Sequence, residues 1–79
     1  MVKRMSPVKY SLISDRIENS SYPQQIVTYG IIARSAEHFS AIRDISTCRL
    51  WVERLVCQLN RLQVSLCHFR EVVEDALAF

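Results

Sequence analysis

The sequence predicts an α+β domain in which a three-stranded antiparallel β-meander is followed by two packed amphipathic helices. Two observations predict this order of elements. In the first half of the chain, apolar residues alternate with polar ones in short segments separated by turn formers, which is typical of β-strands. In the second half, apolar residues recur every three to four positions, which is typical of helices that bury one side. Because the strand segments are joined by short connections, neighbouring strands are expected to pair antiparallel.

Three segments of the first half have strand character. Residues 8–12 alternate in polarity, residues 26–34 (IVTYGIIAR) form the strongest strand, and residues 39–45 (FSAIRDI) form a shorter third strand. The turn formers of residues 15–25 predict a loop, and SAEH predicts a turn. Gly30, inside the strongest strand, indicates a bulge or a close backbone approach. One face of that strand is expected to carry Val27, Tyr29, Ile31 and Ala33.

The second half predicts two helices joined by a short break. Ser46 is expected to cap the first helix, with Ile45 and Leu50 as a hydrophobic staple. Ser65 is expected to cap the second helix. The expected apolar stripes consist of Trp51, Val52, Leu55, Val56, Leu59 and Leu62 in the first helix, and of Leu66, Phe69, Val72, Val73, Ala76 and Leu77 in the second. The polar side of the first helix is expected to carry Arg49, Glu53, Arg54, Cys57, Asn60 and Arg61.

The chain has the length of one small domain. Its 79 residues predict a single domain over residues 7–79, preceded by a flexible N-terminal tail over residues 1–6. With 49% hydrophobic and 23% charged residues, the composition indicates a folded chain and excludes an intrinsically disordered one. A domain of this size buries a small core, and such domains often gain stability by binding a partner or a second copy.

The composition also favours the cytoplasm. No apolar run approaches the ~20 residues of a membrane span. The basic start MVKR is not followed by the apolar segment of a secretory signal. The three cysteines are an odd number, which suits a reducing compartment because they cannot all pair within the chain. We therefore expect a cytoplasmic protein.

The stretch CQLNRLQVSLCHF places two cysteines and a histidine close together, but the helical pattern argues against a metal site there. Cys57 and Cys67 are expected on the polar sides of their helices, pointing apart, and no CxxC pair is present. His38 and His68 lie on different elements. We expect a helix–helix junction with no metal and no cofactor. Cys48 is expected on the core side of the first helix as a small buried residue, and a reactive thiol there is the alternative that stays open.

The sequence also lacks the usual groupings of an enzyme. Its single glycine excludes a glycine-rich phosphate loop. Glu71, Glu74 and Asp75 are interpreted as a solubilising face of the last helix and not as catalytic carboxylates. We therefore expect no catalytic residues and no enzymatic activity.

The best candidate for a binding surface is one side of the first helix. Trp51 lies at the margin of the apolar stripe beside Arg54 and Gln58, and Arg61 projects from the same side as Arg54. Tryptophan and arginine are enriched at the energetic centres of protein interfaces. These four residues are predicted to bind a protein partner. The alternative is that Trp51 only covers the open edge of a small core.

Nucleic-acid binding is the second interpretation. Lys3, Arg4 and Lys9 make the start of the chain basic, and Arg54 and Arg61 would extend that charge. The net charge of +2 is too small to indicate a nucleic-acid partner by itself. The acidic second helix also disfavours a helix-turn-helix that reads a DNA groove.

Four segments together resemble a known family. IVTYGI, IRDIST, CQLNRLQVS and HFREVVEDAL occur in this order, and the resemblance covers about residues 8–77. The chain resembles a family of short, uncharacterised proteins from clostridial and related Firmicutes, known only as a domain of unknown function. It departs from the family at Ser65-Leu66, where Ser-Pro is expected to open the last helix. The resemblance implies a small, intracellular, bacterial accessory protein and supplies no catalytic residues.

These observations predict a small non-enzymatic protein that acts by protein–protein interaction. The alternatives are a nucleic-acid-binding regulator and an anti-CRISPR-type mobile-element inhibitor that blocks a nuclease by occupying its surface. A homodimer also stays open. Ile26, Thr28 and Ile32 form a second apolar face of the central strand, which either a partner or a second copy would have to cover.

Overall fold

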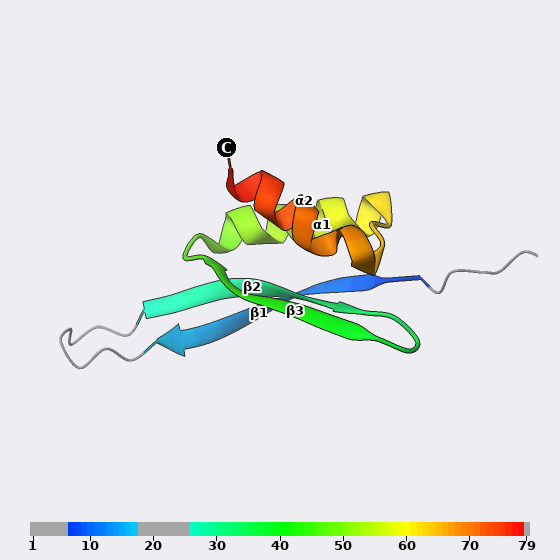
Figure 1. Ribbon diagram of the computed structural model, residues 1–79. Helices are drawn as coiled ribbons and strands as arrows, with labels where there is room; N and C mark the ends of the chain where they lie inside the picture. Colours follow the sequence, from blue (N-terminus) through cyan, green and yellow to red (C-terminus); the bar gives the residue numbers. More distant parts are fainter. Residues whose placement is uncertain (1–6, 18–25, 79) are drawn as a thin grey trace, which may run out of the picture.

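The structure is a computed structural model, which describes residues 7–17 and 26–78. The expected tail over residues 1–6 and most of the expected loop lie outside the described residues. The predicted α+β fold is confirmed: a sheet with strand order β1-β2-β3 is followed by two helices (Figure 1). The elements are β1 (Lys9–Ile17), β2 (Ile26–Arg34), β3 (Phe39–Ser46), α1 (Arg49–Leu62) and α2 (Leu66–Leu77).

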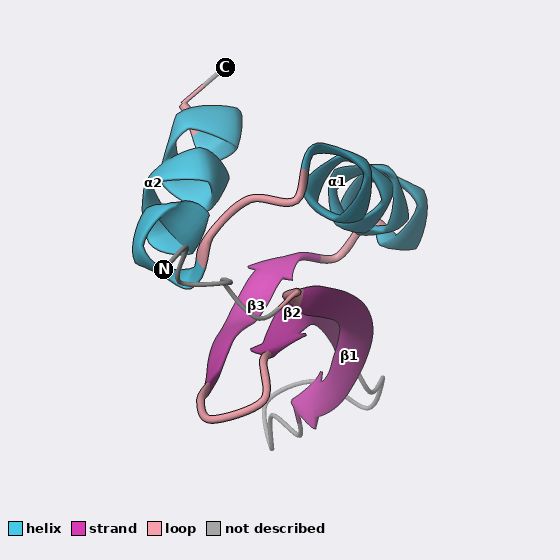
Figure 2. Ribbon diagram, turned by 90° about the vertical axis from the view of Figure 1, so that its right-hand side faces the viewer, coloured by secondary structure: helices cyan, strands magenta, loops and turns pink. Residues whose placement is uncertain are grey.

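Both helices cover the same face of the sheet, and no other described element covers the opposite face, which we call the bare face (Figures 1 and 2). The turn between the helices reverses the chain, so α2 leads back across α1 and rises steeply from the sheet, whereas α1 lies along the sheet. Gln63 ends α1 with a left-handed backbone, φ 48° and ψ 51°, and its N–H returns to the carbonyl groups of Asn60 and Leu59. The predicted helix–helix junction is therefore present.

The first strand is longer than its sequence pattern predicts. It pairs antiparallel with β2 from Lys9 opposite Arg34 to Ile17 opposite Ile26. Residues 15–17 were assigned to a loop because they are polar or adjoin turn formers, and that assignment is wrong. Pairing with a strong neighbouring strand satisfies their backbone groups, which a local sequence pattern does not show.

The third strand contains a bulge. Tyr29 lies opposite Ser46 and Ile31 opposite Ile42, so one residue of β2 faces three residues of β3 between these pairs. Asp44, within the bulge, has a positive φ of 56°. Aspartate tolerates this left-handed conformation better than most residues do. The bulge therefore increases the bend of β3 just before the chain turns into α1.

Gly30 sits where β2 meets this bulge. A Cβ atom at Gly30 would lie 2.3 Å from the carbonyl oxygen of Ile42, so no larger residue fits without a shift. The predicted close backbone approach is thus confirmed. The bulge also changes the face on which Ile45 lies. Strict alternation from Ile42 would place Ile45 on the bare face, whereas Ile45 packs against the core.

The core lies between the sheet and the helices and centres on Tyr10. The Tyr10 and Phe69 rings meet edge to face, with centroids 5.2 Å apart and planes at 60°. The Tyr10 hydroxyl donates a hydrogen bond to the carbonyl oxygen of Val64 in the helix–helix junction. Tyr10 therefore joins β1 to both the junction and α2. The fully buried apolar residues are Tyr10, Ile31, Ala33, Val52, Leu55, Leu59, Phe69 and Val73.

Asn60 is the main correction to the predicted helix faces. It was placed on the polar, outward side of α1, but it reaches the free edge of β1. Its Oδ1 accepts a hydrogen bond from the Tyr10 N–H at 2.8 Å, and its Nδ2 donates to the Tyr10 carbonyl at 2.9 Å. The side-chain amide thus takes the place of a neighbouring strand at one residue of the sheet edge.

The start of α1 also differs from expectation. Ser46 is the last residue of β3 and not the helix cap, although its Oγ accepts a hydrogen bond from the Cys48 N–H at 3.0 Å. Cys48 occupies the N-cap position without a side-chain hydrogen bond. The expected staple between Ile45 and Leu50 is wrong, because Leu50 is 65% exposed.

The ends of the helices expose two residues that were expected in the apolar stripes. Leu62 is 67% exposed and Leu77 is 50% exposed. Both lie in the last turn of their helix, beyond the neighbouring layer that covers the central turns. Ser65 is the N-cap residue of α2 as predicted, although its side chain makes no capping hydrogen bond.

Candidate functional site

One side of α1 carries a continuous strip of solvent-exposed or half-buried side chains. We call it the α1 outer strip. It lines an open depression of about 430 Å³. The strip exists because Val52, Leu55 and Leu59 take up the opposite side of the helix in the core. Its members are Leu50, Glu53, Arg54, Cys57, Gln58 and Arg61.

A second depression of about 320 Å³ lies beside the strip, between the two helices. Trp51 and Leu55 of α1 form its apolar wall, and the small side chain of Ala76 of α2 lies across from them. Arg54 and Gln58 border both depressions. The structure therefore brings together the four residues predicted to bind a partner: Trp51, Arg54, Gln58 and Arg61.

Trp51 is both a core-packing residue and a surface residue. It is half-buried and packs against the core, and it also lines the depression between the helices. A tryptophan with one covered and one accessible side can contribute apolar area to a partner at low entropic cost, because its rotamer is already restrained.

Two arginines of the outer strip are not neutralised. Arg49 pairs with Glu53 through Nε and Oε1 at 2.8 Å, one helical turn apart. Arg54 and Arg61, in contrast, form no ion pair with any side chain in residues 7–17 and 26–78. Their guanidinium groups are therefore available to carboxylates of another molecule.

The structure does not join the basic start of the chain to these arginines. Lys9 is exposed at the beginning of β1. It alternates with Tyr10, which faces the helices, so Lys9 faces the bare side of the sheet. Lys3 and Arg4 lie outside the described residues. Among the residues that can be placed, Lys9 and the Arg54/Arg61 pair belong to opposite sides of the domain.

The bare face of the sheet is partly apolar. Phe39 is 75% exposed on it, and Ile32 is half-buried. Arg43 pairs with Asp15 across β2 at 2.6 Å, above the small residue Gly30. Thr28 on this face is only 3% exposed. Its Oγ1 has no hydrogen-bond partner among the residues that the structure describes.

All three cysteines are free and exposed. The expectation that Cys48 is buried on the core side of α1 is wrong, because the helix begins at Arg49 and Cys48 stands before its first turn. Cys57 and Cys67 are exposed as predicted. Within residues 7–17 and 26–78, no three His, Cys, Asp or Glu side chains are grouped so as to hold a metal ion.

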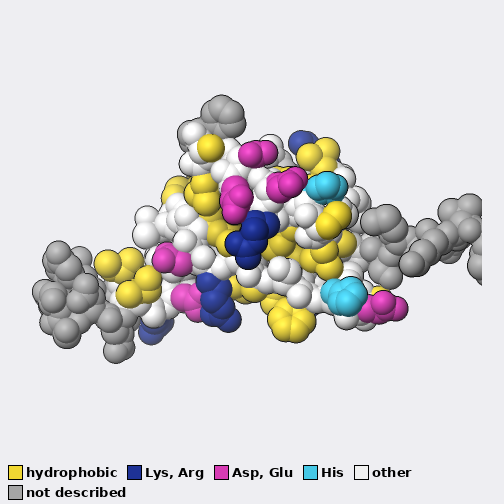
Figure 3. All heavy atoms as spheres, in the orientation of Figure 1, with side chains coloured by type: hydrophobic (Ala, Val, Ile, Leu, Met, Phe, Trp, Pro, Cys, Tyr) yellow, Lys and Arg dark blue, Asp and Glu magenta, His cyan; other side chains and the backbone are white. Residues whose placement is uncertain are grey.

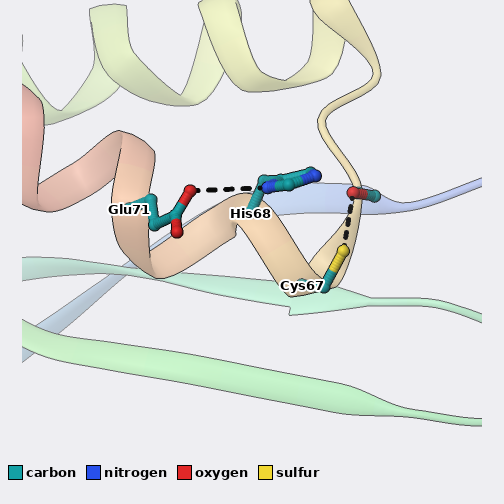
Figure 4. A network of polar contacts seen from close by, with 4 residues as sticks. Cys67, His68 and Glu71 are labelled. Atoms are coloured by element: carbon teal, nitrogen blue, oxygen red, sulfur yellow. Dashed lines mark hydrogen bonds and ion pairs between the residues drawn. The ribbon is translucent and has the colours of Figure 1, made fainter.

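The beginning of α2 carries two polar contacts (Figure 4). The Ser65 Oγ lies 3.3 Å from the Cys67 Sγ, and the His68 Nδ1 lies 3.5 Å from Glu71 Oε2. The thiol and the imidazole thus contact different partners and do not form a nucleophile–base pair with each other. These exposed contacts are expected to contribute little to stability.

Tyr10 is held in its neutral form by its surroundings. Burial raises the pKa of the Tyr10 phenol above the ordinary value of 10.0, and the negative charge of a Cys67 thiolate raises it further. The hydrogen bond that Tyr10 donates to Val64 requires the same protonated form. Tyr10 is therefore a structural residue whose proton is part of the fold.

Neither helix is long and apolar enough to cross a membrane, as far as the structure describes the chain. No curated protein and no solved structure matched the sequence. A family model did match, and it covers residues 2–78, nearly the whole chain. The chain therefore belongs to DUF6514, a family of unknown function.

Proposed function

We propose that this protein is a small, non-enzymatic interaction module that docks onto another protein through α1. The contact surface consists of the α1 outer strip together with Trp51. One observation carries the proposal: Trp51, Arg54, Gln58 and Arg61 line two adjoining depressions that share Arg54 and Gln58. A single rigid helix thus presents accessible apolar area and two available cations next to each other.

The chemistry of this surface fits a protein better than a small molecule. Interface hot spots combine aromatic side chains with arginine in partly enclosed positions. Leu50, exposed at one end of the strip, adds apolar area that a partner would cover. The proposal assigns no catalytic role, and the separate contacts of Cys67 and His68 support that choice.

The setting of this function follows from the resemblance to clostridial proteins. We propose a bacterial, cytoplasmic accessory or regulatory protein. The odd number of cysteines and their exposed, free state are consistent with a reducing compartment. A clostridial lysate is therefore the appropriate source of partners.

The test is a tagged capture from that lysate, with and without nuclease treatment, read by mass spectrometry. The Trp51→Ala/Arg54→Ala variant is compared with wild type and with Arg34→Ala, a matched arginine at the end of β2. We expect a stoichiometric protein that survives nuclease, is lost with the α1 variant and is retained with Arg34→Ala. The far-UV circular dichroism of both variants should remain native.

Two outcomes would contradict the proposal. A partner retained by the Trp51→Ala/Arg54→Ala variant would show that α1 is not the contact surface. Recovery that collapses on nuclease treatment would favour a nucleic-acid-binding regulator instead. Capture of a nuclease itself would narrow the proposal to an inhibitor that occupies a nuclease surface.

A further inference from the structure

The two edges of the sheet differ in regularity. β1 and β3 form the edges, because β2 lies between them. The bulge at Asp44 interrupts β3, and such a bulge turns an edge away from any further strand. β1, in contrast, pairs with β2 over its whole length without a shift of register. The edge of β1 is therefore the one that can accept another strand.

The backbone groups of β1 point alternately toward β2 and away from it. In an antiparallel ladder, every second residue turns its N–H and carbonyl outward. Tyr10 is such a residue, because both of its backbone groups bind the side chain of Asn60. The unbroken register gives Leu12, Ser14 and Arg16 the same outward direction, and we call these three residues the open edge of β1. No residue within 7–17 and 26–78 forms a hydrogen bond with their outward backbone groups.

The helices do not cover the end of β1 that carries the open edge. Ser14, Arg16 and Ile17 are all exposed. The end of β1 extends past the start of α1 in Figure 1, and Figure 3 shows hydrophobic side chains on the surface at this end of the sheet. Ile17 and its neighbour Ile26 are each 41% exposed. A further strand can therefore reach this edge, and it would cover apolar area there.

We propose that the open edge of β1 pairs antiparallel with the open edge of a second copy of this chain, which joins the two sheets into one. A two-fold axis at Ser14 places the two Ser14 residues opposite each other. The same axis places Leu12 of each copy opposite Arg16 of the other. Each of the three residue pairs exchanges two bonds, so about six hydrogen bonds satisfy all outward groups of both open edges.

Two limits on β1 favour a second copy as the occupant. At one end, Asn60 occupies the outward groups of Tyr10, and at the other end β1 stops at Ile17. The residues between these limits are symmetric about Ser14, so a second copy pairs all of them and needs no others. Each Tyr10 then lies past the end of the other copy's β1. The two Tyr10 residues are roughly 27 Å apart along the paired strands, so the two Asn60 contacts are undisturbed.

The side chains that meet across the axis are compatible. Arg16 lies beside the half-buried Leu12 of the second copy, which the methylene groups of the arginine can cover. On the bare face, Asp15 lies opposite Ile13 of the second copy. The Asp15 carboxylate points away from the edge, across β2, to Arg43 at 2.6 Å. No like charges therefore stand directly opposite each other, as a stable pair of strands requires.

The dimer uses a surface separate from the α1 outer strip, so the inference goes beyond the proposed function and does not depend on it. A two-fold axis perpendicular to the joined sheet keeps the helices of both copies on one face. The dimer thus presents two α1 outer strips, and a partner with two matching sites would bind it more tightly than the monomer. Three residue pairs form a small interface, so the dimer depends on concentration.

The experiment is amide hydrogen exchange of the whole chain, measured by NMR from about 0.05 to 1 mM, a range chosen because small interfaces bind weakly. The amides of Leu12, Ser14 and Arg16 should become severalfold more protected as the concentration rises, because only the dimer bonds them. The amide of Ala41 should not change, because Ala41 lies opposite Ile32 and points outward from β3. Sedimentation equilibrium should show the mass rising from 9.2 kDa toward twice that value.

A proline at the axis tests the pairing itself. Ser14→Pro removes an N–H that points away from β2, so the β1–β2 ladder keeps its bonds and the chain tolerates the proline. The dissociation constant of the dimer should rise about tenfold or more, because the two-fold axis doubles the loss. Ala41→Pro makes the same change at the edge of β3 and should leave the dimer unchanged. Circular dichroism shows whether each variant is folded.

A cysteine at the axis tests the register without a proline. The three native cysteines are first replaced by serine. Ser14→Cys then places two thiols opposite each other on residues whose Cα atoms lie about 5.5 Å apart, which suits a disulfide. Mild oxidation should link this variant into a covalent dimer. Ser40→Cys, a matched serine in β3, should form no more than background.

Three results would overturn the inference. They are a mass of 9.2 kDa at all concentrations, a dimer of equal strength in folded Ser14→Pro, and equal crosslinking of Ser14→Cys and Ser40→Cys. Protection of the open edge by a captured protein, without any dependence on concentration, would assign the edge to another occupant and would also overturn it. Capture by the Trp51→Ala/Arg54→Ala variant tests only the proposed function, so the two can fail separately.

Discussion

The two sides of α1 carry side chains of similar kinds but differ in burial and in the contacts that these side chains make. On the inner side, Leu59 is fully buried and Asn60 makes two hydrogen bonds to the edge of β1. On the outer side, Leu50 is mostly exposed, and Arg54 forms no ion pair among the described residues. The difference teaches that half of this helix determines the fold, while the other half is available for contacts with other molecules. The two should be separable by substitution.

The largest expected effect compares one leucine from each side. Leu59→Ala removes a fully buried side chain and leaves a cavity, which should lower the free energy of unfolding by about 2–5 kcal/mol. Leu50→Ala makes the same chemical change on the outer side and should stay within about 0.5 kcal/mol of wild type. Urea denaturation followed by circular dichroism measures both. Equal losses of unfolding free energy in the two variants would contradict the distinction between the two sides of α1.

A second pair tests the polar residues in the same way. Asn60→Ala leaves the N–H and the carbonyl of Tyr10 without their side-chain partner and should cost about 1–3 kcal/mol of unfolding free energy. Gln58→Ala, on the outer side, is the matched control and should cost less than about 0.5 kcal/mol. If Asn60→Ala were as mild as Gln58→Ala, water would be replacing the amide at the sheet edge.

Stability at alkaline pH tests the role of Tyr10, which packs against the inner side of α1. Because the folded protein raises the pKa of Tyr10 above 10.0, the neutral phenol is favoured in the folded state. Its contribution to stability is full below pH 10.0 and is lost as pH rises through the raised pKa. Denaturation midpoints measured from neutral to alkaline pH should fall above this point. The decrease of the midpoint at alkaline pH should be smaller in Tyr10→Phe. An equal decrease in this variant would show that other titrating groups cause it.

The smallest expected effect is on the outer side itself. Arg54→Ala/Arg61→Ala removes two exposed cations that lack ion pairs within the described residues, so the free energy of unfolding should change by no more than about 0.5 kcal/mol. Thermal and urea unfolding should both agree with wild type. A loss above 1 kcal/mol, judged against the usual range for surface substitutions, would mean that these arginines support the fold.

Sequence periodicity predicted the type and order of the elements and the side of α1 on which the candidate residues lie. A strand that is covered on one face buries every second residue, and a helix buries every third or fourth residue. The alternation in β2 and the three-to-four spacing in α1 therefore indicate which residues are buried. The same helical spacing placed Trp51, Arg54, Gln58 and Arg61 on one flank of α1, and the structure has two depressions on that flank. Local patterns carry this information because each residue's side is set by its own helix or strand.

Features that depend on contacts between distant segments were not predictable in this way. Helical spacing places Asn60 on the polar, outward side of α1, but Asn60 binds the backbone of Tyr10, which lies 50 residues earlier in the sequence. The bulge at Asp44 moves Ile45 into the core, against strict alternation. Cys48 was misplaced because β3 continues through Ser46 and delays the start of α1. In each case the backbone path of another element decides the outcome.

Site-specific photocrosslinking in cells tests the central claim most directly. A photoreactive amino acid replaces Gln58 on the outer side of α1 in one variant, and Ala41 in β3, on the bare face of the sheet, in a second variant. The account predicts a defined protein adduct, resistant to nuclease, from position 58 and none from position 41. Adducts from position 41 alone would contradict it and would move the contact surface to the sheet.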